Sequence, residues 1–408
     1  MTQSEIEKIR NDFPILKQTV YGKPLVYMDN GATTQKPQVM IDTLVRMYQT
    51  MNANIHRGVH YLSEQATEVY EQARQTVQQF IHAACSQEII FTKGATDGIN
   101  TIAFSFGEAF IRQDDEVIVS EMEHHSNIVP WQMMCDRKKA RLRVIPMTER
   151  GELDLETYRT LLSPKTKLVA VTYVSNTLGT INPLREIIQA AHQAGACILV
   201  DAAQAIQHIA IDVQALDCDF LAVSGHKLYG PTGIGFLYGK RDLLNAIPPY
   251  QGGGDMIECV TFAHTTYNEL PFKFEAGTNN YVDAAGLAAS IGYLNQIGMD
   301  RIAAYERELT SYALEQLNSI PDLRLYGQAD NRVATFSFLV GKIHPYDMGM
   351  VLDKLGIAVR TGTHCTQPIM DKYDIDGTVR ASLALYNTKE EINKLAEGIL
   401  KARRLLSK

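Results

Sequence analysis

The chain has 408 residues, of which 45% are hydrophobic, and a formal net charge of −7. This length exceeds what one compact core usually holds, so two domains are expected. The acidic balance, with no concentrated basic segment, argues against nucleic acid or an anionic membrane surface as the main partner. There is no secretory signal pattern, and no apolar stretch approaches the roughly 20 residues of a membrane span, which predicts a cytoplasmic protein.

The six cysteines are scattered and form no CxxC pair, as expected of a protein in a reducing cytosol. Five of them are predicted to be small buried hydrophobic residues. The adjacent histidines His124 and His125 do not predict a zinc site. Neighbouring residues rarely chelate one ion, and no second His/Cys cluster has ligand spacing.

In chain order, a helix is predicted first over residues 66–81, where apolar side chains recur on one helical face. Seven short apolar runs follow, and they begin near residues 88, 116, 142, 168, 197, 220 and 233. Strands that are buried on both faces give continuous apolar runs, and helical segments between them indicate parallel connections. We therefore predict an α/β fold in which a mostly parallel, seven-stranded sheet is sandwiched by helices.

The pattern changes after about residue 286. A helical stripe covers 302–317, alternation at 333–338 predicts a strand, and Thr388 with Glu391 forms a capping box before the last helix. These features predict a smaller α+β domain. The expected division is an N-terminal segment at 1–30 that joins the small domain, a large domain at 31–286 and a small C-terminal domain at 287–408.

Lys227 lies in a Gly-rich turn directly after the predicted strand at 220–224. Ligands of open α/β sheets bind at the carboxyl ends of the strands, and a lysine desolvated there becomes a nucleophilic amine. An isolated lysine in such a turn is more often a solvated loop residue. Asp201 changes that balance, because it ends the buried run at 197–201 and pyridoxal phosphate needs a carboxylate opposite its ring nitrogen. Gln204, one helical turn later, could reach the same site.

Two further strand ends carry polar residues. Thr96 lies in a Gly- and Thr-rich segment at the start of a predicted helix, where backbone N–H groups and a hydroxyl favour a phosphate. Ser224 and His226 could close round the same phosphate, although Thr96 could equally be only a helix cap. His124 follows the run at 116–120, where an imidazole suits stacking on a cofactor ring and proton transfer.

Cys365 lies in a polar, turn-forming loop with Arg360 and His364 nearby, a setting that favours a thiolate. Alone, it would be interpreted as a loop cysteine without function. Arg380 precedes the last apolar segment, where its guanidinium could hold a substrate carboxylate in a two-pronged contact. A structural ion pair is the alternative interpretation of Arg380.

Taken together, these segments resemble the aspartate-aminotransferase fold family of pyridoxal-phosphate enzymes, and within it the SufS-type (group II) cysteine desulfurases. The resemblance extends from Phe13 to the last helix. Its most specific motifs are LVYMDNGATTQKP, NANIHRGVHYLSEQAT, FTKGATDGIN, VSNTLGTINP, VDAAQA, SGHKLYGPTGIG, FEAGTNN and AVRTGTHC.

The resemblance implies a role for each matching residue. Lys227 would bind pyridoxal phosphate as a Schiff base and move protons at the substrate α-carbon. His124 would stack on the ring, while Asp201 and Gln204 would face its pyridine nitrogen and phenolic oxygen. The phosphate would be held by four side chains, the last from the other subunit of a homodimer: Thr96, Ser224, His226 and Thr278. The substrate end of the pocket would be formed by Asn176, which also adjoins the cofactor, and by Arg380, Arg360 and His56.

The resemblance also implies that Cys365 attacks the sulfur of L-cysteine and gives L-alanine and a persulfide. An acceptor protein of the SufE or SufU kind would then take the sulfur for iron–sulfur cluster assembly in the SUF system. Three residues depart from the common group II pattern: Thr363 and Thr366 in the cysteine loop, and Asp97 where glutamate is frequent. These departures leave the reacting groups intact but bear on persulfide shielding and on the partner.

Other functions fit the same residues. A selenocysteine lyase, acting on L-selenocysteine, or a general aminotransferase would use the same lysine, although a transaminase has no need of Cys365. A non-catalytic sulfur-carrier scaffold would be expected to lack Lys227, Asp201 or His124, and all three are present.

Overall fold

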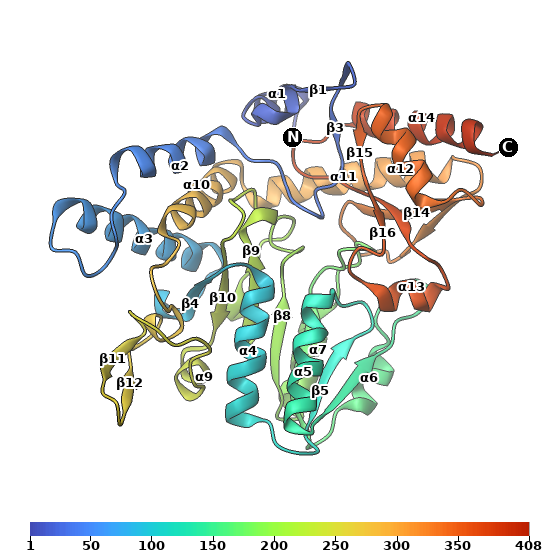
Figure 1. The fold of residues 1–408 in the computed structure, drawn as a ribbon. Coiled ribbons are helices and arrows are strands. Elements are labelled where there is room, and N and C mark those ends of the chain that lie inside the picture. The colour runs from blue at the N-terminus through green and yellow to red at the C-terminus, as the bar shows by residue number, and fades with distance from the viewer. Residues whose placement is uncertain (408) are drawn as a thin grey trace.

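The structure, a computed structural model, describes residues 1–407. Its large part is a sheet covered by helices (Figure 1), and within the described residues the strands lie in the order β4-β10-β9-β8-β7-β5-β6. Their bounds are β4 Ile89–Thr92, β5 Glu116–Ser120, β6 Arg141–Ile145, β7 Thr166–Thr172, β8 Cys197–Asp201, β9 Phe220–Ser224 and β10 Gly235–Gly239. Strand β10 runs antiparallel to both neighbours, and the other pairs are parallel. The predicted mostly parallel, seven-stranded sheet is confirmed.

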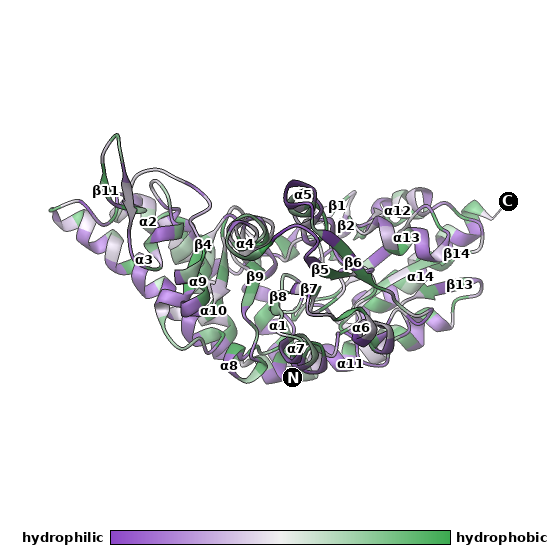
Figure 2. Ribbon diagram, turned by 90° about the horizontal axis from the view of Figure 1, so that it is seen from below, coloured by the Kyte–Doolittle hydropathy of each residue, from purple (hydrophilic) through white to green (hydrophobic). Residues whose placement is uncertain are grey.

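The sheet is buried because helices cover both of its faces. Figure 2 shows α4 (Ala95–Phe110) and α5 (Val129–Lys138) on one face and α7 (Leu184–Gln193) on the other. All residues of the interior strands β8, β9 and β10 are buried or nearly so, as their continuous apolar runs predict. The edge strand β6 is partly exposed, because it has only one neighbouring strand.

Three helices pack on one another beside β4: α2 (Gln38–Thr50), α3 (Tyr61–Phe80) and α10 (Tyr281–Ile297). The helix predicted over 66–81 forms most of α3. The predicted domain boundary between 286 and 287 falls inside α10, so the chain passes between the two parts through a helix and not through a linker. The division into domains stays a prediction.

The C-terminal part contains an antiparallel sheet in the order β13-β14-β17-β16. Its strands are β13 Leu323–Tyr326, β14 Thr335–Val340, β17 Thr378–Ser382 and β16 Arg360–Gly362, and its helices include α11 Met299–Asn318, α12 Pro345–Lys354, α13 Gln367–Tyr373 and α14 Lys389–Leu406. The predicted capping box of Thr388 and Glu391 begins α14. The N-terminal segment joins this part through the parallel pairing of β3 (Val26–Tyr27) with β15 (Ile357–Ala358).

The remaining elements are α1 Gln3–Asn11, β1 Thr19–Val20, β2 Lys23–Pro24, α6 Leu155–Leu161, α8 Val213–Leu216, α9 Arg241–Ala246, β11 Ile257–Val260 and β12 Thr265–Tyr267. Strands β11 and β12 form a hairpin that projects from the large part (Figure 1). Of the helices in residues 1–407, none combines the length and the apolar character that a membrane span requires.

Candidate active site

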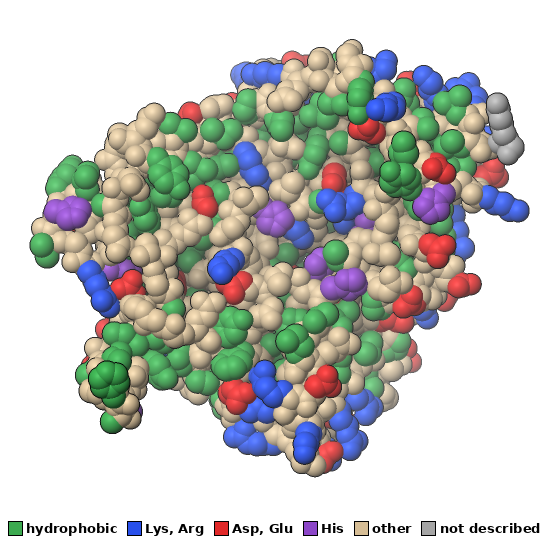
Figure 3. All heavy atoms as spheres, in the orientation of Figure 1, with side chains coloured by type: hydrophobic (Ala, Val, Ile, Leu, Met, Phe, Trp, Pro, Cys, Tyr) green, Lys and Arg blue, Asp and Glu red, His purple; other side chains and the backbone are tan. Residues whose placement is uncertain are grey.

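A cavity of about 230 Å³ lies where the carboxyl ends of the parallel strands meet the C-terminal part. Figure 3 shows histidine side chains gathered near the middle of one face of the molecule. The predicted site residues that line the cavity are Thr96, His124, Asn176, Asp201, Gln204, Ser224, His226, Lys227, Arg360, Cys365 and Arg380. Their placement is a structural observation, and the role of each residue stays a prediction.

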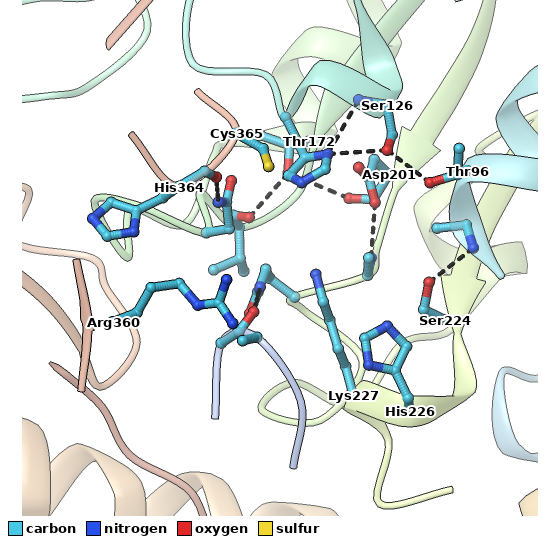
Figure 4. A pocket seen from close by; sticks show the side chains of 18 of the residues that line it. Thr96, Ser126, Thr172, Asp201, Ser224, His226, Lys227, Arg360, His364 and Cys365 are labelled. Atoms are coloured by element: carbon cyan, nitrogen blue, oxygen red, sulfur yellow. Dashed lines mark hydrogen bonds between the residues drawn. The ribbon is translucent and has the colours of Figure 1, made fainter. Parts of the chain in front are cut away.

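Lys227 points into the centre of the cavity (Figure 4). It is the last residue of η4 (Gly225–Lys227), a single 3₁₀ turn that directly follows β9. Burial lowers the pKa of its amine to about 8, although the nearby carboxylate of Asp201 opposes this shift. Neutral amine is therefore available near physiological pH, as a nucleophilic lysine requires. Lys36 steadies the turn, because its Nζ donates to the carbonyl oxygen of His226 at 2.8 Å.

Asp201 and Gln204 reach the cavity from one short segment at the end of β8. Oδ1 of Asp201 accepts a hydrogen bond of 2.9 Å from the N–H of Ala203. Burial raises the pKa of this carboxyl, and Lys227 opposes that effect. Nε2 of Gln204 donates to the carbonyl oxygen of Gly31 at 2.6 Å. A ligand here would meet a buried carboxyl group and an amide on the same side.

His124 lies in the loop that follows β5. Burial lowers the pKa of its imidazole to about 3, so the ring is neutral at physiological pH. The N–H of Ser126 donates to Nδ1 at 3.1 Å, which assigns the ring proton to Nε2. Oγ of Ser126 also lies 2.7 Å from Oγ1 of Thr96. The imidazole and the first turn of α4 therefore belong to one hydrogen-bonded network.

The start of α4 lines one side of the cavity. The N–H of Ala95, its first residue, donates to Oγ of Ser224 at 2.8 Å. Thr96, Ser224 and His226 lie on the same side of Lys227 (Figure 4). Free N–H groups and the dipole at a helix start attract anions. This side of the cavity therefore suits a phosphate group.

Cys365 is exposed at the rim of the cavity. It and His364 have backbone φ angles of +58° and +54°, in the left-handed region that non-glycine residues rarely adopt. Two hydrogen bonds of 2.8 Å hold this loop against the large part. Nδ2 of Asn176 donates to the carbonyl oxygen of His364, and the N–H of His125 donates to the carbonyl oxygen of Cys365.

The electrostatic setting of Cys365 differs in part from the predicted one. His364 was expected to add positive charge beside the thiol, but its ring is buried, with Nε2 2.8 Å from Oγ1 of Thr378. Burial lowers the pKa of this imidazole to about 3, so it is neutral. The positive charge near the thiol therefore comes from Arg360, Arg380 and Lys227.

Arg380, on β17, is buried behind the rim. Its Nη1 donates to the carbonyl oxygen of Asn176 at 2.9 Å, and its Nη2 donates to Oδ1 of Asp29 at 3.2 Å. Within residues 1–407, its buried Nε has no hydrogen-bond acceptor. A buried donor without a partner is costly unless a ligand or water supplies an acceptor. The guanidinium is therefore poised to receive a further acceptor, as a carboxylate would provide.

Comparison with known proteins agrees with this geometry. The model of the family "Aminotransferase class-V" matches residues 26–395. The chain belongs to this family. A "Cysteine desulfurase" of Shigella flexneri is 52% identical over 402 residues, which are 98% of this chain and 99% of that protein.

Two solved structures share the class-V fold over nearly the whole chain. The cysteine desulfurase CsdA from Escherichia coli superposes with a TM-score of 0.91 at 36% identity, covering 98% of this chain and 99% of CsdA. The apo cysteine desulfurase from Thermococcus onnurineus NA1 superposes with a TM-score of 0.92 at 37% identity, covering 98% of each chain.

The donors and acceptors of this class-V site fit pyridoxal phosphate. Ser224 and the start of α4 would hold the phosphate, and the amine of Lys227, which lines the same cavity, would bind the cofactor's aldehyde. The buried carboxyl of Asp201 would face the ring nitrogen. Arg380 lines the same cavity, so its guanidinium group would be a donor for a substrate carboxylate.

Two of the predicted site residues, His56 and Thr278, do not line this cavity. His56 does not line it within one chain, because contacts with the middle of α3 and with Phe272 hold the residue elsewhere: its Nε2 is 3.4 Å from Oε1 of Glu71, and its ring packs against that of Phe272. Thr278 lines a separate cavity of about 370 Å³ near Asp97. Thr278 stays a candidate for the site of a second subunit, whereas His56, which was predicted to line the pocket, does not line the cavity of its own chain.

The cysteines other than Cys365 only partly match the prediction of burial. Cys135 and Cys218 are buried, and Cys85 and Cys197 are partly buried. Cys259 is exposed, because the β11–β12 hairpin that carries it projects from the sheet and its helices (Figure 1). Residues 1–407 contain no group of three or more His, Cys, Asp and Glu side chains arranged to hold a metal ion.

Proposed function

We propose that the chain is a cysteine desulfurase that uses pyridoxal phosphate to remove sulfur from L-cysteine, giving L-alanine and a persulfide on Cys365. The observation that carries this proposal is the exposed thiol of Cys365 at the rim of a cavity whose centre is Lys227. A transaminase needs the lysine but has no use for a thiol at this place. The match with cysteine desulfurases over nearly the whole chain supports the same conclusion.

Bound in the cavity, pyridoxal phosphate supplies an electron sink for chemistry at the substrate's α-carbon. Lys227 takes and returns the proton at that carbon, because its lowered pKa keeps part of the amine neutral. Asp201 keeps the ring nitrogen protonated from its buried position. His124, neutral with its proton on Nε2, would stack on the cofactor ring and donate a hydrogen bond from that nitrogen to a reacting group. Arg380 and Arg360 hold the substrate carboxylate.

Sulfur leaves the substrate by attack of Sγ of Cys365 on the substrate sulfur. A sulfur–sulfur bond forms while the bond between that sulfur and the substrate Cβ breaks, and the electron pair of the broken bond goes to the carbon side. Protonation there gives alanine. The persulfide on the exposed rim then passes its outer sulfur to a thiol of an acceptor protein. We propose an acceptor of the SufE or SufU kind, in cytoplasmic iron–sulfur cluster assembly by the SUF system.

A pair of cysteine variants tests the proposal. Cys365→Ser removes the rim thiol, and Cys259→Ser is a matched control because that thiol is also exposed but lies on the distant hairpin. Alanine and sulfide formed from L-cysteine are measured with a small thiol as acceptor. We expect Cys365→Ser to keep the bound cofactor and lose on the order of a hundredfold or more in rate. Cys259→Ser should stay within about twofold of the unaltered enzyme, and unaltered sulfide release by Cys365→Ser would overturn the persulfide step.

The variant Cys365→Ser and the unaltered enzyme also distinguish sulfur from selenium chemistry. A lyase that simply expels the better leaving group, selenium, needs no thiol on the enzyme. With L-selenocysteine as substrate, full activity of Cys365→Ser together with negligible activity of the unaltered enzyme on L-cysteine would identify a selenocysteine lyase. We expect substantial activity on L-cysteine that depends on Cys365.

We further infer a homodimer. Large apolar side chains are exposed on α2, just before α3 and in the first turn of α3: Val39, Val45, Tyr48, Val59, Tyr61 and Leu62. Figure 3 shows apolar side chains over this side of the molecule. His56 belongs to the segment between α2 and α3, and Thr278 lies just before α10, where the hydroxyl of Tyr281 donates to Oδ1 of Asn52 at 2.8 Å. A second copy seated here would cover the apolar surface and bring both residues toward another cavity.

A further inference from the structure

Asp29 lies between the two arginines at the substrate end of the cavity. Its Oδ1 accepts from Nη2 of Arg380 at 3.2 Å, and both of its oxygens accept from Nε of Arg360 at 3.2 Å. The side chain of Arg380 is 2% exposed, that of Asp29 17% and that of Arg360 48%, so the pair of Asp29 with Arg380 is only weakly screened by solvent, whereas Arg360 also faces the solvent. Asp29 is not among the residues that line the cavity, so it acts from behind the two guanidinium groups.

The other titratable side chains of the cavity do not add positive charge at this end. Burial lowers the pKa of His124 and His364 to about 3 and that of His226 to about 4, so all three rings are neutral at physiological pH. Lys227 is occupied by the cofactor in the loaded enzyme, and Asp201 faces the ring nitrogen. Apart from the thiol of Cys365, the charges at the substrate end are therefore two guanidinium groups and one carboxylate, which leave one net positive charge.

We propose that Asp29 is a specificity-determining residue, which cancels one guanidinium charge so that the pocket matches an amino acid with a single carboxylate. The inference rests on the proposed function, in which Arg380 and Arg360 receive the substrate carboxylate. Once its amine is bound, cysteine with a neutral thiol brings one negative charge to a pocket with one uncompensated positive charge. An amino acid with a second anionic group leaves a negative charge unpaired in a partly desolvated site, which is unfavourable.

The substitution Asp29→Asn removes the negative charge of this side chain but keeps its size and shape. The variant keeps an oxygen that accepts hydrogen bonds from the arginines but raises the net charge of the pocket from one positive charge to two. Asp330→Asn is the matched control, because Asp330 also pairs with an arginine, Arg150 at 3.0 Å, on the exposed surface. Asp29→Glu is the second control, because it retains the charge.

The experiment measures binding of L-alanine, with one carboxylate, and L-aspartate, with two, to each holoenzyme by titration calorimetry. We expect Asp29→Asn to raise the affinity for L-aspartate relative to L-alanine by roughly tenfold, because the added charge acts twice on the dianion. Asp330→Asn and Asp29→Glu should keep the ratio of the unaltered enzyme. Equal losses for both ligands, or an unchanged ratio, would show that Asp29 only supports the fold and would overturn the proposal.

Arg360→Gln provides a test of opposite sign that does not depend on the stability of Asp29→Asn. Removal of one guanidinium makes the substrate end neutral, so the affinity ratio should fall by a similar factor, and a ratio that stays constant contradicts the charge argument. KM and kcat for L-cysteine are measured on the same proteins. Absence of sulfide release by the unaltered enzyme would refute the proposed function. The ratio of the affinities for L-aspartate and L-alanine tests the role of Asp29 independently of that result.

Discussion

Nδ2 of Asn176 donates a hydrogen bond of 2.8 Å to the carbonyl oxygen of His364, the residue directly before Cys365. This bond joins the loop after β7, in the large part, to the loop that carries the thiol. A second link is buried beside it, where Oγ1 of Thr177 lies 2.7 Å from Oγ1 of Thr366. The position of the thiol relative to Lys227 is therefore set by contacts between the two parts.

Thr177→Val should loosen the Cys365 loop without changing the cavity lining. The hydroxyl of Thr366 already donates to the carbonyl oxygen of Thr363 at 2.9 Å, so the hydroxyl of Thr177 is the donor in their mutual bond. Its loss should lower the free energy of unfolding by about 1 kcal/mol and speed alkylation of the Cys365 thiol. Denaturant unfolding and timed iodoacetamide labelling measure these effects.

The control for this prediction is Thr160→Val, which removes an exposed hydroxyl that donates to the carbonyl oxygen of Thr157 at 2.8 Å. It should change the free energy of unfolding by less than about 0.5 kcal/mol and leave the alkylation rate unaltered. Equal alkylation rates for Thr177→Val and the unaltered protein would mean that the buried hydroxyl pair does not hold the loop.

The amine of Lys227 should titrate far below an ordinary lysine. Burial lowers its pKa from 10.5 to about 8, and Asp201 limits the shift. In the cofactor-free protein, labelling of Lys227 by acetic anhydride should therefore rise with pH and level off above about pH 8. Asp201→Asn removes the opposing carboxylate, so its labelling profile should move to lower pH. A profile centred near pH 10.5, or a shift to higher pH in Asp201→Asn, would contradict the burial argument.

Disruption of the apolar surface on α2 should produce a monomer. Val45→Glu combined with Tyr48→Glu places unpaired charges on this surface, and we expect the dimer dissociation constant to rise by about a hundredfold or more. Activity should fall with it, because His56 and Thr278 would no longer reach a partner's cavity. Light scattering gives the mass, and Tyr346→Glu on α12 is the control because this tyrosine is also exposed. A mass that stays constant in the double variant would remove the basis for the shared site.

The sequence predicts the sheet well because each of its strands is a short apolar run. Interior strands are buried on both faces, so their runs are continuous, and β5, β8 and β9 have the predicted bounds. The smaller strands β11, β12, β15 and β16 were not predicted, because two to four residues carry too little periodicity. The predicted boundary after residue 286 was placed where the sequence pattern changes. Helix α10 nevertheless continues through this position, because one helix can pack against two layers of a structure.

The sequence predicted those site residues that lie directly after a predicted strand and whose residue type by itself suggests a role. Sequence analysis missed residues whose role depends on contacts between distant segments, such as Asp29, Lys36 and Ser126. Glu123 is a further example: its buried carboxyl group accepts from the N–H of Thr172 at 2.9 Å and from Nδ2 of Asn127 at 2.7 Å, which ties the end of β5 to the end of β7. An acid beside a histidine pair gives no signal of such a link until the strand order is known.

The buried histidines predict a loss of stability at mildly acidic pH. His124, His226 and His364 have ordinary pKa values of 6.5 when unfolded, and burial lowers these to between about 3 and 4 in the folded chain. Below pH 6.5 the unfolded chain therefore binds protons that the folded chain does not bind. The free energy of unfolding must then fall as pH falls, by up to about 1.4 kcal/mol per pH unit for each such proton.

His364→Asn isolates one of these protons. His364 is 7% exposed, and it should alone account for about 2 kcal/mol of the stability lost between pH 7 and pH 5. Denaturant unfolding of the cofactor-free protein at pH 5, 6 and 7 should give a shallower dependence for His364→Asn, while His264→Asn, at an exposed position, keeps the slope of the unaltered chain. Parallel slopes for His364→Asn and the unaltered chain would mean that the buried ring takes up its proton without unfolding. It would then be able to charge the loop beside Cys365, in contradiction to the neutral ring inferred from its burial.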